Sequence, residues 1–98
     1  MGVLQKQGVM GRLSRACRKC LGRIHDQCFK PRDLDMVITS IQEGDHGAGS
    51  LHYMDPGEAF DFRMLSIPLS EIKTAAGPGF DVVKSHAGAC HVEHDPKI

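Results

Sequence analysis

One seven-residue stretch, EAFDFRM at positions 58–64, constrains the fold more than any other segment of the chain. Its apolar and polar side chains alternate, and successive side chains of a β-strand point to opposite faces of a sheet. Phe60 and Phe62 therefore share one face, while Asp61 and Arg63 share the other. Because the chain holds only four Phe, one Tyr and no Trp, we expect the two phenylalanines to face the core. Asp61 is then left to face a site.

A second layer must cover the apolar face of that strand, and the basic N-terminal segment is suited to this. Between residues 10 and 28 apolar side chains recur at spacings of three and four, with Arg and Lys on the opposite side. This pattern predicts an amphipathic helix, which ends before Pro31 because proline disfavours helix at the residue that precedes it. The apolar positions are Met10, Leu13, Cys17, Cys20, Leu21, Ile24 and Cys28.

Four further segments complete the predicted fold. Residues 34–39 are apolar and β-branched, and they predict a strand buried on both faces or nearly so. Residues 67–77 begin near a proline and end at a glycine, which predicts a short helix. Residues 80–83 and 90–94 predict two more strands.

These elements predict an α+β fold in which the N-terminal helix packs on a small, mostly antiparallel sheet with one short inserted helix. We expect three or four strands. A chain of 98 residues is expected to form a single domain over residues 1–98. The basic amphipathic helix accounts for residues 1–32, and residues 33–98 form the core that carries the motifs.

Charge is distributed unevenly along the chain, although the formal net charge is zero. Residues 1–32 hold eight Lys or Arg and one acid, whereas residues 33–98 hold four and eleven. We interpret the basic segment as the solvated side of a helix docked on an acidic body, in preference to a nucleic-acid-binding surface. No apolar run approaches about 18 residues, and the first residues lack the apolar core of a signal peptide. We therefore expect a soluble protein made in the cytoplasm, with no membrane partner.

Three side chains of the types that commonly bind divalent metals lie on or beside the predicted strands. His52 precedes the strand that holds Asp61, and His91 lies on the last strand. Catalytic zinc sites use three protein ligands from His, Asp or Glu and leave a fourth position for water. His52, Asp61 and His91 are therefore a candidate zinc (Zn2+) site. The alternative is that the histidines are ordinary surface residues or histidines whose ring nitrogens have hydrogen-bond partners within the protein.

Two motifs resemble those of the zinc D-alanyl-D-alanine carboxypeptidase family, which includes small phage and microvirus members that act on peptidoglycan peptides. The resemblance covers residues 34–96. The family's first motif, S-x-H-x-x-G-x-A-x-D, is matched in order by Ser50, His52, Gly57, Ala59 and Asp61. Its second motif ends in a ligand histidine, written H-V-E in the small viral members, and is matched by His91, Val92 and Glu93.

This resemblance implies a zinc-dependent peptidase that hydrolyses an amide bond in peptidoglycan stem peptides. The reaction would be that of a D,D- or L,D-type carboxypeptidase or endopeptidase, with His52, Asp61 and His91 as the zinc ligands. The phage and microvirus members imply a virus-encoded enzyme that acts on a host cell wall. The sequence carries no signal for a particular oligomeric state.

The chain departs from the family pattern at two places. Eight residues separate His52 from Asp61, where the family has six. The family also has an acid three residues before the last ligand, where it serves as general base, and this chain has Gly88 there. His86, Glu93 or Glu43 could act as the general base instead. By alternation Arg63 shares the face of Asp61, and it could hold a substrate carboxylate or an oxyanion.

The cysteines spell C-x2-C-x4-H-x2-C over Cys17, Cys20, His25 and Cys28. This spacing is similar to that of a nucleic-acid-binding zinc knuckle, but the last gap is two residues short of that motif. Because the three cysteines fall on the apolar stripe of the predicted helix, we expect them to be buried core thiols. A second metal site and redox pairing are the alternatives. Cys90 is expected to be buried on the face opposite His91.

Two other functions remain compatible with these residues. A zinc-stabilised domain that has lost catalysis could bind peptidoglycan or a protein partner, and the absence of an acid at Gly88 is the reason to consider it. The basic helix with its cysteines could instead bind nucleic acid, in which case the affinity would fall steeply with salt.

Overall fold

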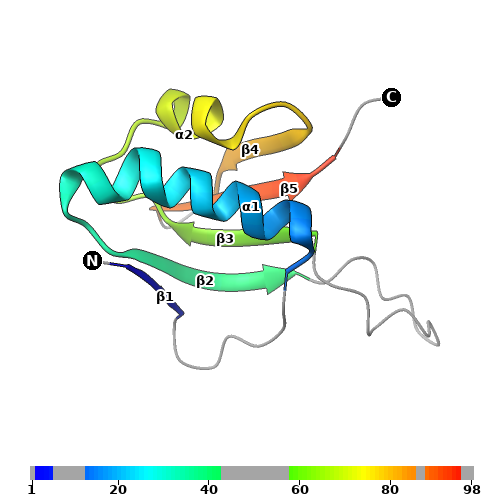
Figure 1. Cartoon of the computed structure of the whole chain (residues 1–98), viewed down its shortest axis with the longest axis horizontal. Helices are drawn as coiled ribbons and strands as arrows, with labels where there is room; N and C mark the ends of the chain where they lie inside the picture. The colour runs from blue at the N-terminus through cyan, green and yellow to red at the C-terminus, as the bar shows by residue number, and fades with distance from the viewer. Residues whose placement is uncertain (1, 6–12, 43–57, 86–87, 96–98) are drawn as a thin grey trace.

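The computed structural model describes residues 2–5, 13–42, 58–85 and 88–95, which form an α+β fold (Figure 1). Within these residues, five strands form one sheet in the order β1-β2-β3-β5-β4. The strands are β1 (Val3–Gln5), β2 (Met36–Gln42), β3 (Ala59–Arg63), β4 (Phe80–Lys84) and β5 (Ala89–His94). Two helices, α1 (Arg15–Ile24) and α2 (Leu69–Ala76), lie on one side of this sheet. The predicted fold class is confirmed.

Helix α1 begins later and ends in a different way than the sequence predicts. Ser14 is its N-cap, and the Ser14 hydroxyl accepts a hydrogen bond of 3.2 Å from the backbone N–H of Cys17. Such a bond satisfies one of the N–H groups that the first turn leaves without an intrahelical partner. Beyond α1 the chain continues as a π-helical turn, His25–Phe29, and a 3-10 turn, Lys30–Arg32. Helical structure therefore extends past Pro31.

The sheet contains one strand more than predicted. Strand β1 runs parallel to β2, with Val3 opposite Met36. The backbone N–H of Met36 also donates to the carbonyl of Gly2 at 2.9 Å. The remaining neighbours in the sheet pair in antiparallel fashion. Met36 and Ile38 of β2 are buried, and Val37 between them is half-buried. The strand was expected to be buried on both faces or nearly so, and its second face is half-buried rather than fully buried.

The core lies between the sheet and the helices. Phe60 and Phe62 of β3 are fully buried there, as the alternation predicts. The ring of Phe62 lies edge-on to that of Phe29, with centroids 5.7 Å apart, and is stacked at 6.0 Å from Phe60. Such pairs stabilise a core beyond the burial of their area. Asp61 lies on the other face of the sheet. We call this the far face because it lies opposite α1 and α2.

The four cysteines are free thiols, and all of them are fully buried. Cys17 and Cys20 lie on the buried side of α1, Cys28 on the π-helical turn and Cys90 on β5. Burial raises the pKa of Cys20 and of Cys90 to about 12 and that of Cys28 to about 11. These side chains act as small core residues, which confirms the prediction of buried core thiols.

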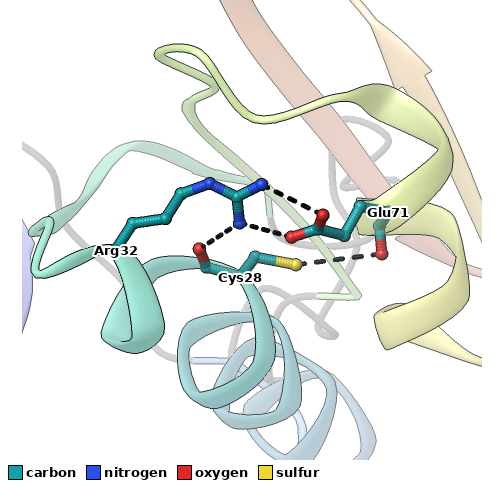
Figure 2. Close-up of polar contacts among 3 residues, drawn as sticks. All are labelled: Cys28, Arg32 and Glu71. Atoms are coloured by element: carbon teal, nitrogen blue, oxygen red, sulfur yellow. Dashed lines mark hydrogen bonds and ion pairs between the residues drawn. The ribbon is translucent and has the colours of Figure 1, made fainter.

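Arginines of the basic segment attach it to α2. The guanidinium of Arg23 donates to the carbonyls of Ala75 and Ala76 at 3.3 and 2.6 Å, and so satisfies carbonyls at the C-terminal end of α2. Arg32 forms a two-pronged ion pair with Glu71 and also donates to the carbonyl of Cys28 (Figure 2). Through these contacts the basic N-terminal segment is docked on α2. No helix in the described ranges is long and apolar enough to cross a membrane.

The Arg32–Glu71 pair predicts a pH-dependent contribution to stability. Its hydrogen bond lowers the pKa of Glu71 below the ordinary value. Because the folded pKa lies below the unfolded one, the stabilisation is present above the unfolded pKa and is lost as the pH falls through the folded pKa. We expect Glu71→Gln to lower the thermal midpoint slightly at neutral pH, as exposed ion pairs do. The gap between variant and wild type should close in acid, and a constant gap would contradict the prediction.

Candidate functional site

Strands β3 and β5 place Asp61 beside His91. The two strands are neighbours in the sheet although β4 lies between them in sequence, and their antiparallel register sets Asp61 directly opposite His91. Phe60 and Phe62, which flank Asp61 in β3, point into the core. Cys90 and Val92, which flank His91 in β5, do the same. The alternation of both strands therefore turns Asp61 and His91 onto the far face together.

His91 is held by a carboxylate at each of its ring nitrogens. Nδ1 of His91 lies 2.6 Å from Oδ1 of Asp61, and Nε2 lies 3.2 Å from Oε1 of Glu93. The side chains of His91 and Asp61 are each 20% exposed, whereas that of Glu93 is 53% exposed. Partial burial disfavours the imidazolium, but the hydrogen bonds and charges of the two carboxylates outweigh it and raise the pKa of His91.

We expect this contact to appear in a histidine titration of the metal-free protein. His91 should titrate above its ordinary value of 6.5. A raised folded pKa stabilises the fold below the unfolded pKa, and this stabilisation is lost as the pH rises through the folded value. NMR titration of the ring protons would measure the pKa in wild type and in Asp61→Asn, where it should fall. An unchanged pKa in Asp61→Asn would show that the carboxylate does not act on the ring.

Asp61 and His91 fit a zinc ion in donor type, and they lie close together. Zinc binds imidazole nitrogen and carboxylate oxygen, and two ligands of one tetrahedral ion lie about 3.3 Å apart. Nδ1 and Oδ1 are 2.6 Å apart, so their separation would have to widen by about 0.7 Å to reach this value. Small rotations of the two side chains would be enough for this change. Among the residues that the structure describes, no three His, Cys, Asp or Glu side chains form a metal site. The third predicted ligand, His52, lies outside those residues.

Of the residues predicted to take part in catalysis, His86 and the alternative base Glu43 lie outside the described residues. Arg63 is exposed at the end of β3 and makes no hydrogen bond or ion pair with another described residue. It shares the far face with Asp61, about 7 Å further along the strand. Glu93 contacts His91 directly. Gly88 adopts a φ of +77°, a conformation that side chains with a Cβ rarely take.

The chain was compared with protein-family models, with curated proteins and with solved structures, and none of the three comparisons finds a match. The family resemblance therefore depends on the motif residues themselves. Of the three predicted ligands, the structure brings Asp61 and His91 together.

Sequence reasoning missed a second pair of histidine and carboxylate. Nδ1 of His94 lies 2.7 Å from Oε2 of Glu58, and the His94 ring lies against Phe80 with centroids 5.0 Å apart. By alternation with Glu93, His94 faces the helix side of the sheet, and its side chain is 27% exposed. Spacing along the sequence gives no signal for this pair, because Glu58 and His94 are brought together by the pairing of β3 with β5.

Proposed function

We propose that the protein is a zinc-dependent peptidase that hydrolyses an amide bond in peptidoglycan stem peptides. The observation that carries this proposal is the 2.6 Å contact between His91 and Asp61. These are the two described residues that match ligand positions of the resembled family, and they lie 30 residues apart in sequence. His52 would complete the ligand set. Zinc, when bound, supplies Lewis acidity to the scissile carbonyl and to the attacking water.

The far face offers groups for the rest of the reaction. Arg63, on the same strand as Asp61, makes no hydrogen bond or ion pair with another described residue, and its guanidinium would donate hydrogen bonds to the terminal carboxylate of a peptide or to an oxyanion. A peptide that is bound between Arg63 and the Asp61–His91 pair would place an amide bond near its C-terminus at the ligands. His86 and Glu93 are the candidates for the general base, and the role of Glu93 is taken further below.

Hydrolysis of a synthetic stem peptide that ends in D-Ala-D-Ala tests the proposal. Zinc-loaded wild type should release D-Ala, detected by mass spectrometry, and a chelator should stop the release until zinc is restored. Arg63→Gln should lower kcat/KM by about 10–100-fold through the loss of a charged hydrogen bond. Arg15→Gln is the matched control, because Arg15 is exposed on α1. If neither this peptide nor a cross-linked cell-wall peptide is cleaved, the proposal is wrong.

The backbone at Gly88 favours a second candidate function. In the resembled family an acid stands at this position, but the φ of +77° strains any residue other than glycine. A domain that uses zinc for stability and binds cell-wall peptide without cleaving it fits this feature. It predicts that the zinc-loaded protein binds the peptide in calorimetry without turnover, and that removal of zinc lowers the thermal midpoint. Turnover of the bound peptide would exclude it.

A further inference from the structure

Two carboxylates fix the orientation of the His91 ring. Asp61 reaches Nδ1 from the neighbouring strand, and Glu93 reaches Nε2 from two residues along the same strand. If the ring were turned by half a rotation about its bond to Cβ, carbon atoms would face both carboxylates and both contacts would be lost. The observed orientation is therefore the one in which each ring nitrogen has a partner.

If a metal ion binds, Asp61 and Glu93 must have different roles at the His91 ring. An ion that is shared by Asp61 and His91 must bind at Nδ1, because this is the nitrogen beside the Asp61 oxygen. Nε2 then keeps its proton and donates it to Glu93. The two nitrogens point in diverging directions from the ring, so the Glu93 oxygen that holds Nε2 lies on the side away from the ion.

We propose that Glu93 is a positioning residue, which accepts the Nε2–H of His91 and so directs Nδ1 toward Asp61 and the metal. The inference rests on the proposed function, and it assigns Glu93 a task other than general base. Carboxylates that accept the second N–H of a metal-bound histidine fix the ring orientation and raise the basicity of the ligand. Glu93 is mainly exposed, whereas the ring that it holds is mainly buried, so it can act from the rim of the site.

Two substitutions of Glu93 separate the roles of positioning residue and general base. Glu93→Gln keeps an oxygen that can accept the Nε2–H, whereas Glu93→Ala removes it. For a positioning residue, zinc affinity measured by chelator competition should fall by about 10–100-fold in Glu93→Ala and stay near the wild-type value in Glu93→Gln. For a general base, Glu93→Gln would lower kcat by about 10²–10⁴-fold at unchanged zinc affinity, and this result would overturn the inference.

A matched control comes from the second histidine pair. Glu58→Ala breaks the contact between Glu58 and His94 and leaves the partners of His91 in place. Its zinc affinity should equal that of wild type. Equal affinities in Glu93→Ala and Glu58→Ala would show that the Glu93 contact does not support the metal.

Nitrogen-15 NMR gives a readout that does not depend on activity. In the metal-free protein the Nε2–H of His91 should exchange slowly in wild type and rapidly in Glu93→Ala, and zinc should shift the Nδ1 resonance. A shift at Nε2 would overturn the inference even if the protein binds zinc and cleaves peptide. If wild type binds no zinc, the proposed function fails, and the exchange rate of the Nε2–H still decides whether Glu93 holds the ring.

Discussion

Replacement of Asp61 by alanine is expected to lower zinc affinity by more than about 100-fold. Loss of a residue that only hydrogen-bonds to a metal ligand already lowers metal affinity by about 10–100-fold, and Asp61 is proposed to be a ligand itself. Asp61 is the described carboxylate at Nδ1 of His91. The substitution lies on the far face of the sheet, so the core beneath it should stay packed. Metal analysis of purified protein should find stoichiometric zinc in wild type and almost none in Asp61→Ala, and peptide hydrolysis should be lost with it.

Two variants control for this result. Asp26→Ala removes an exposed carboxylate on the π-helical turn, whose partner is His25 rather than His91, and it should keep its zinc. Cys20→Ala should also keep zinc, because Cys20 is a fully buried core thiol. If Asp61→Ala retained zinc and Cys20→Ala lost it, the metal would belong to the cysteine motif, and the proposed function would have to be abandoned.

Replacement of Phe62 by alanine is expected to cost about 3–5 kcal/mol of the free energy of unfolding. Phe62 is fully buried and packs against both Phe29 and Phe60. Domains of this kind are stable by roughly 5–15 kcal/mol, so the loss is a large share of the total. Urea titration followed by circular dichroism measures it. Because Phe62 faces the core next to Asp61, loss of its packing also weakens the constraint that turns Asp61 outward.

Conservative and surface changes should behave differently. Phe62→Leu fills most of the same volume and should cost less than about 1.5 kcal/mol. Val83→Ala, at a side chain on β4 that is 52% exposed, should stay within about 0.5 kcal/mol of wild type. If Phe62→Ala cost no more than Val83→Ala, Phe62 would not be a core residue and the assignment of the two sheet faces would be wrong.

The sheet face on which each strand residue lies could be predicted from the sequence, but the side chains that it contacts could not. Alternation in β3 predicts that Phe60 and Phe62 turn inward and Asp61 turns outward, and the structure agrees. The same reasoning correctly buries Cys90. By contrast, the contact of Glu93 with His91 depends on rotamers within one strand. A pattern of apolar residues specifies no rotamer of an exposed acid.

Local periodicity predicts β2, β3, β4, β5 and the two helices, the amphipathic side of α1 and the orientation of Asp61, because these depend on the periods of helix and strand. The position of β5 between β3 and β4 and the pairing of Asp61 with His91 arise instead from long-range packing. The place of β1 is also a tertiary effect, because its three residues are exposed and carry no alternating pattern. Strand order and register depend on how the apolar faces of distant segments pack under α1 and α2, and no local pattern encodes that choice.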